Sequence, residues 1–144
     1  MGFSMADSLL LHGLHFDPTH FRFLFTLWLR HGLNNGGRPR SIGLGGNISI
    51  SMDEFMYHQQ PYTAKEDQFN NGNGSLMRLA PLPVAFSNQP EKAVALSALQ
   101  SLTTHNGEVA AECCRLMASI LVTLINRPKD KNGKEALAEA CANF

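Results

Sequence analysis

Three things are scarce in this sequence: cysteine, net charge and long apolar runs. The cysteines are an adjacent pair and one near the end, Cys113, Cys114 and Cys141, which argues against a disulfide framework and favours reduced thiols. Basic and acidic residues balance at 12 each, so no charge excess points to nucleic acid. The apolar run 116–125 is too short to span a bilayer, and the first residues lack the basic start of a signal peptide. We expect a cytoplasmic protein with no nucleic-acid or membrane partner.

Common catalytic and metal-binding motifs are also missing. The sequence has no Cys-x-x-Cys, Glu-x-x-His or Asp-x-Asp spacing, so the residues alone predict no metal site. Ser75 lacks the Gly-x-Ser-x-Gly turn of a nucleophilic serine. Neither Ser75 nor Cys113 has support as a nucleophile beyond its residue type. We therefore assign no catalytic residue from the motifs.

What the sequence does contain is helical periodicity. Apolar residues recur at steps of three and four, and no segment alternates as a strand would. Asp17 followed by Pro18 predicts a helix start, and Gly32 predicts its end. These patterns predict an all-α fold in a single domain over residues 1–144. The expected helices cover 5–12, 18–31, about 47–56, a proline-split segment 76–86, 90–102, 108–126 and 134–142. Asn47 or Ser49 is the expected N-cap of the third helix.

The periodicity also predicts which faces are buried. The helix from Pro18 should be central and buried, because Phe23 and Leu27 add apolar surface on sides other than its main stripe. The expected helices 90–102 and 108–126 should each bury an apolar stripe. In helix 90–102 the stripe is Ala95, Ala98, Leu99 and Leu102. In helix 108–126 it is Val109, Cys113, Leu116, Met117, Ile120 and Leu124. Residues 33–46 and 58–74 are polar and rich in breakers, which predicts long irregular loops.

The stretch 71–78, Asn-Gly-Asn-Gly-Ser-Leu-Met-Arg, is the most distinctive in the chain. Its glycines allow a tight turn and a close approach to the backbone. Ser75 before an apolar run predicts a helix N-cap, and free N–H groups at a helix start favour an anion. Asn-Gly is also a hairpin signal, although the flanking residues do not alternate. A plain turn between helices stays open as the alternative.

The order of several blocks resembles the ADP-ribosylglycohydrolase family. The matching blocks extend from Ser4 to Leu137, and the run Gly-Asn-Gly-Ser-Leu-Met-Arg is the most specific of them. The blocks that carry the resemblance are residues 6–10, 16–18, Trp28 with Gly32, 41–47, 72–81, Thr104-His105 and 111–121.

The resemblance implies an all-α hydrolase that cleaves the glycosidic bond between ADP-ribose and a protein or another acceptor. It implies that a pair of magnesium ions takes part, and that ADP-ribose or an ADP-ribosylated protein is the partner. The residues implied to lie beside ADP-ribose are Gly72, Asn73, Gly74 and Ser75, with His105 near the diphosphate.

The sequence departs from this family at the magnesium ligands. Residues 1–5 stand where the family has Thr-Asp-Asp, and the sequence contains no Asp-x-Asp-Thr/Ser motif. We therefore expect a truncated domain that does not bind magnesium stably and hydrolyses weakly or not at all. Two alternatives stay open, namely a non-catalytic module that binds ADP-ribose or a nucleotide, and a helical interaction protein. Uncovered apolar helix faces would favour self-association.

Overall fold

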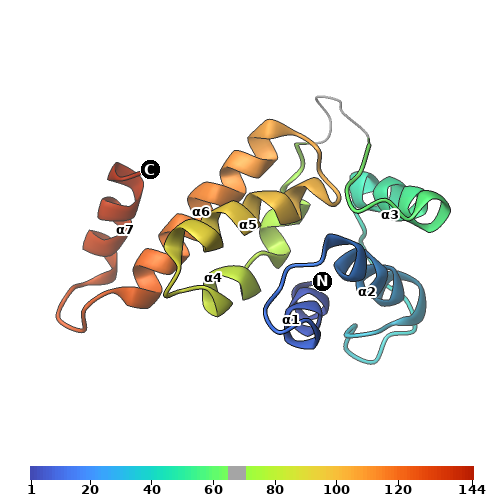
Figure 1. Ribbon diagram of the computed structural model, residues 1–144, viewed down its shortest axis with the longest axis horizontal. Helices are drawn as coiled ribbons and strands as arrows, with labels where there is room; N and C mark the ends of the chain where they lie inside the picture. Colours follow the sequence, from blue (N-terminus) through green and yellow to red (C-terminus); the bar gives the residue numbers. More distant parts are fainter. Residues whose placement is uncertain (65–70) are drawn as a thin grey trace.

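The computed structural model describes residues 1–64 and 71–144, and Figure 1 shows how its helices are arranged. All regular structure in the described residues is helical, which confirms the all-α prediction. The predicted loop 58–74 lies partly outside these residues. The elements are α1 (Gly2–Leu11), α2 (Pro18–His31), α3 (Gly46–His58), the 3-10 helix η2 (Asn73–Arg78), α4 (Pro81–Ala85), α5 (Pro90–Leu102), α6 (Glu108–Asn126) and α7 (Gly133–Ala142).

The limits of α2 follow directly from its sequence. The Asp17 side chain accepts a hydrogen bond from the His20 N–H, and Pro18 occupies the first turn, as predicted. The helix ends at Gly32, whose φ of 73° lies in the left-handed region. A Cβ at Gly32 would lie 2.0 Å from the Arg38 carbonyl oxygen, so this position requires glycine for space as well as for conformation.

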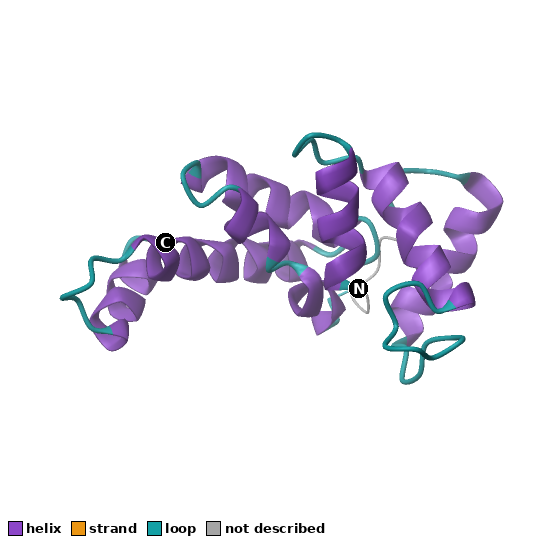
Figure 2. Ribbon diagram, turned by 90° about the horizontal axis from the view of Figure 1, so that it is seen from below, coloured by secondary structure: helices purple, strands orange, loops and turns teal. Residues whose placement is uncertain are grey.

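The helices form a long molecule in which the α5–α6 pair is central. α4 and η2 pack against this pair, α1 packs against α2, α4 and η2, and α3 packs against α2 (Figure 1). At the other end, α7 packs against α6 and extends away from the body in both ribbon views (Figure 2). The main core lies between α1, α2, α4 and the neighbouring helices, with Phe21, Phe25, Met52, Leu82 and Phe86 fully buried.

The predicted inner faces of α5 and α6 are wrong. In α5, Ala98 is buried as expected, but Leu99 is 37% exposed, and the fully buried positions include Ser97, Gln100 and Ser101. In α6, Val109 is 61% exposed, and the residues turned inward are mostly small: Ala110, Ala111, Cys114, Ala118 and Val122. The two helices pack through small and polar side chains, which leaves larger apolar residues outside.

Two smaller predictions also fail. Phe23 is 49% exposed, so α2 is a one-sided helix and not one that is apolar all round. Asn47 or Ser49 was the expected cap of the third helix, whereas Gly45 is the N-cap of α3 and no side chain caps it. No helix in the described part of the chain is long and apolar enough to cross a membrane.

Candidate functional site

A cavity of about 270 Å³ lies between the start of α3, the glycine loop and the end of α5. We call it the glycine-loop cavity. Its walls come from three segments far apart in the sequence: residues 45–48, residues 72–77 and His105. Four glycines contribute to this lining, which is completed by Asn47, Ile48, Asn73, Met77 and His105. The structure thus brings together the predicted residues Gly72, Asn73, Gly74 and His105.

Two of these glycines are needed because His105 lies against them. A Cβ at Gly74 would lie 2.7 Å from Ile48 Cδ1 and 2.9 Å from His105 Cε1, both too close. A Cβ at Gly72 would lie 3.3 Å from His105 Nε2. The glycines therefore allow the imidazole to lie directly on the loop backbone.

His105 is a buried, neutral imidazole at the cavity wall. Its side chain is 2% exposed, and its Nδ1 lies 2.7 Å from the Thr104 hydroxyl oxygen. Burial, with a further contribution from the nearby Arg78 charge, lowers the pKa of His105 to about 4. Its other nitrogen, Nε2, is the one beside Gly72 and Gly74. At neutral pH this nitrogen can form a hydrogen bond with a ligand without adding positive charge.

Two predictions concern Ser75, namely that it caps a helix and that it lies beside ADP-ribose. Ser75 does not cap a helix, because the N-cap of η2 is Gly72 and Ser75 lies inside the 3-10 turn. Its side chain is fully buried, and its hydroxyl contacts the Ser101 hydroxyl at 2.9 Å and the Cys114 thiol at 3.3 Å. These contacts fasten the glycine loop to α5 and α6. The predicted place of Ser75 beside ADP-ribose stays a prediction.

A buried network behind the loop holds its shape. Gln100 Nε2 donates to the Ser75 carbonyl at 3.1 Å, and Gln100 Oε1 accepts from Arg78 Nε at 2.8 Å. Arg78 also donates to the Gln100 carbonyl at 2.8 Å and to the Thr103 hydroxyl at 3.1 Å. The loop, the end of α5 and His105 are therefore held as one unit.

Arg78 is the unusual member of this network. Its guanidinium is fully buried, with the rings of Phe21 and Phe25 beneath it. No described carboxylate pairs with it, and burial lowers the pKa of Arg78 to about 9. Sequence reasoning missed both Arg78 and Gln100, because nothing in helical periodicity marks a polar residue as buried. The Met-Arg end of the glycine stretch was the available signal for Arg78.

The start of α3 adds a second polar feature to the cavity. Gly46 and Asn47 are the first residues of this 13-residue helix, and both line the cavity. A helix start carries a partial positive charge and N–H groups that point outward. The glycine N-cap leaves backbone room for a ligand, because Gly45 and Gly46 have no atom near an added Cβ. An oxyanion suits this combination.

The donors around the cavity do not fit a magnesium pair. Magnesium prefers carboxylate oxygen and water, whereas the side chains here are two amides, one imidazole and apolar groups. In residues 1–64 and 71–144, no three His, Cys, Asp or Glu residues group as metal ligands would. We derive no chemical step through magnesium from these residues.

Other charged residues lie elsewhere and have partners of their own. Asp53 pairs with Arg30 at 2.7 Å, and Glu112 forms an exposed ion pair with Arg115 on α6. Arg38 and Arg40 are exposed in the loop after α2. They do not line the glycine-loop cavity.

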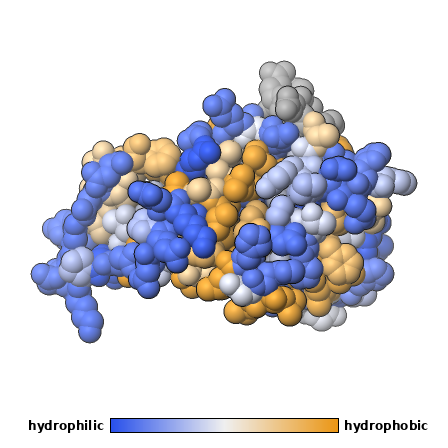
Figure 3. Space-filling model, in the orientation of Figure 1, coloured by the Kyte–Doolittle hydropathy of each residue, from blue (hydrophilic) through white to orange (hydrophobic). Residues whose placement is uncertain are grey.

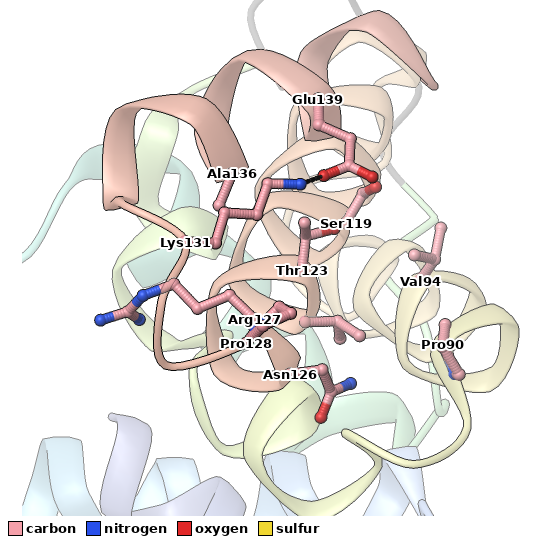
Figure 4. Close-up of a pocket in the computed structure, with 11 residues that line it drawn as sticks. Pro90, Val94, Ser119, Thr123, Asn126, Arg127, Pro128, Lys131, Ala136 and Glu139 are labelled. Atoms are coloured by element: carbon pink, nitrogen blue, oxygen red, sulfur yellow. Dashed lines mark hydrogen bonds and ion pairs between the residues drawn. The ribbon is translucent and has the colours of Figure 1, made fainter.

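A second cavity, of about 410 Å³, lies between α5, α6 and α7. We call it the α7 cavity. In Figure 4, Pro90 and Val94 lie on one side, Ser119 and Thr123 on the α6 wall, and the Lys131–Glu139 ion pair at the rim. It contains no glycine and no buried titratable group. None of the predicted site residues reaches it.

Comparison with known proteins identifies the family to which the chain is similar. The family profile described as ADP-ribosylglycohydrolase matches residues 1–144. An ADP-ribosylarginine hydrolase Tri1 from Pseudomonas putida (strain GB-1) is 28% identical over 126 residues, which are 88% of this chain and 33% of that protein. The protein of the same name from Serratia proteamaculans (strain 568) is 26% identical over 126 residues, 88% of this chain and 34% of its own length. The chain thus spans about a third of the length of these curated relatives.

Proposed function

Because this chain belongs to the ADP-ribosylglycohydrolase family, we propose that its glycine-loop cavity binds part of ADP-ribose. The activity we propose to test is the family's hydrolysis of the bond between ADP-ribose and an acceptor. Both relatives are named ADP-ribosylarginine hydrolases, so an ADP-ribosylated arginine side chain is the acceptor to try first.

The observation that carries the proposal is the contact of His105 with the glycine loop. An imidazole nitrogen, the Gly72–Gly74 backbone and the start of α3 converge on one cavity. Each of these three can donate hydrogen bonds from N–H groups. A diphosphate, which is rich in acceptor oxygens, is therefore a suitable ligand. The volume of about 270 Å³ is at the small end for a ligand site, so it suits the diphosphate and one ribose better than the whole molecule.

The chemistry of the lining limits what this cavity can do. Within residues 1–64 and 71–144 no carboxylate lines it, so these residues give the cavity no carboxyl group for general acid or general base catalysis of glycoside cleavage. We propose that these residues bind and orient the substrate and that this chain does not hold magnesium stably. Hydrolysis by the chain by itself is then expected to be weak or absent.

Calorimetric titration with ADP-ribose, with and without magnesium, tests this proposal. We expect binding that is the same in both conditions and that is lost in Gly74→Val. Release of ADP-ribose from an ADP-ribosylarginine peptide, measured in parallel, should be near the uncatalysed rate. No binding in either condition would contradict the proposed site, and magnesium-dependent turnover abolished by a chelator would contradict the proposed lack of a metal centre.

A second candidate function is self-association, and a specific surface favours it. An apolar groove of about 500 Å³ lies between α1 and α4, beside Phe3 (74% exposed), Leu10 (72%) and Val84 (66%). Figure 3 shows apolar surface across the middle of the molecule, where these helices lie in Figure 1. Exposed apolar surface of this kind marks an interaction site.

Sedimentation of Leu10→Glu beside the natural protein tests self-association through this groove, because the substitution should shift any dimer to monomer. A monomer at all concentrations would contradict it.

A further inference from the structure

Thr104 and His105 form a buried pair whose two possible hydrogen-bond arrangements leave different polar hydrogens without a protein partner. Thr104 is 1% exposed and His105 is 2% exposed, and the Thr104 hydroxyl oxygen lies 2.7 Å from His105 Nδ1. A neutral imidazole carries its proton on either Nδ1 or Nε2. In the first case the threonine hydroxyl must accept a hydrogen bond from Nδ1, and in the second it must donate one to Nδ1.

With the proton on Nδ1, the imidazole would donate to the hydroxyl oxygen. The Thr104 hydroxyl hydrogen would then need another acceptor, and the described residues provide none within hydrogen-bond distance. A buried hydroxyl hydrogen without an acceptor is unfavourable. With the proton on Nε2, the hydroxyl donates to Nδ1, and the hydrogen without a protein partner is the Nε2–H at the cavity wall, where water or a ligand can accept it. Hydrogen-bond pairing therefore selects the Nε2–H form.

The geometry of the cavity determines what this form does. Nε2 lies beside Gly72 and Gly74, and no described residue forms a hydrogen bond with it. Both glycines lack the Cβ that would otherwise fill the space in front of the ring. An Nε2–H therefore faces the cavity as a free donor next to the start of α3.

We propose that Thr104 is a positioning residue that fixes His105 as an Nε2–H donor for an oxygen of a bound diphosphate. The ligand class rests on the proposed function above, whereas the tautomer does not. Thr104 acts through His105, because it does not line the cavity itself. The low pKa of His105 agrees with this role, since a protonated ring could not accept the threonine hydroxyl hydrogen.

The test is a long-range ¹⁵N–¹H NMR spectrum of the ¹⁵N-histidine-labelled chain at pH 7.5, with His105 assigned by its loss in His105→Gln. We expect an unprotonated Nδ1 and a protonated Nε2 in the natural protein. Thr104→Val, which keeps the shape and removes the hydroxyl, should shift the Nδ1 resonance of His105, because Nδ1 then accepts no hydrogen bond. Thr104→Ser should restore the natural spectrum. Thr26→Val removes a part-buried hydroxyl on α2 and should leave the His105 signals unchanged.

Titration with ADP-ribose then separates this inference from the proposed function. We expect Thr104→Val to weaken binding about tenfold, equivalent to ~1.4 kcal/mol, and Thr104→Ser to bind normally. An Nδ1–H form in the natural protein, or an Nδ1 resonance that is unchanged in Thr104→Val, would overturn the inference. The expected tautomers together with no ADP-ribose binding by the natural protein would overturn the ligand and the proposed function, but confirm Thr104 as the residue that sets the tautomer.

Discussion

The glycine-loop cavity and the α7 cavity differ in what lies behind their walls. The glycine-loop cavity is the smaller, about 270 Å³ against about 410 Å³, but a buried network connects its wall to two helices. The α7 cavity is bordered by a helix that packs on α6 through Ala136 and Ala140 and by the exposed Lys131–Glu139 pair. Volume therefore does not identify the site. The buried polar network behind the wall is the better indicator of the site. Burying polar groups costs free energy, so a network of this kind indicates that the shape of the wall matters for function.

The largest effect is expected for Gln100→Ala. This substitution leaves Arg78 Nε and the Ser75 carbonyl without their partners and opens a cavity behind the glycine loop. Unfolding in urea should show a loss of about 3–5 kcal/mol. Gln60→Ala removes an exposed glutamine side chain and should change stability by less than about 0.5 kcal/mol. If both substitutions lowered the free energy of unfolding equally, the buried network behind the glycine loop would not be special.

The next effect is expected for Gly74→Ala. Its Cβ would clash with Ile48 and His105, so we expect a loss of about 1–3 kcal/mol in stability and at least tenfold in ADP-ribose affinity. Gly133→Ala, at the start of α7, is the matched control, because no atom lies within 4 Å of its added Cβ. Differential scanning calorimetry and ADP-ribose titration measure both. Normal ADP-ribose binding by Gly74→Ala would contradict the close contact.

A smaller effect should appear as the pH falls. The pKa of His105 is about 4 in the folded chain against 6.5 as its ordinary value, so the unfolded chain binds more protons between these pH values. The stability that depends on neutral His105 is complete above about pH 6.5 and is lost progressively towards pH 4. Urea unfolding of the natural protein and of His105→Gln at several pH values measures this. The variant should lose less stability over that range, and parallel curves would refute the buried neutral imidazole.

The smallest effect is expected at the rim of the α7 cavity. Lys131→Met breaks an ion pair whose side chains are 30% and 48% exposed. Such pairs contribute about 0–1 kcal/mol, and salt screens them. We expect a change of less than about 1 kcal/mol in urea unfolding and no change in ADP-ribose binding. A clear loss of binding would place the ligand in the α7 cavity instead.

Sequence reasoning worked where the signal was local. Asp17, Pro18 and Gly32 set the limits of α2, and the glycine stretch was singled out from its own residues, whereas Thr104-His105 came from the resemblance to the family. It failed where packing overrides periodicity. In α5 and α6 the small residues Ala93, Ala111 and Ala118 face inward because close helix packing requires them, although Leu99 and Val109 are more apolar. The buried roles of Gln100 and Arg78 depend on partners that are distant in sequence, so no local pattern reveals them.

A crystal structure of this chain with ADP-ribose tests the central claim most directly. We predict that the diphosphate lies against Gly72 and Gly74, with one of its oxygens within hydrogen-bond distance of His105 Nε2. Ligand density in the α7 cavity, or a diphosphate bound away from the glycine loop, would contradict the account.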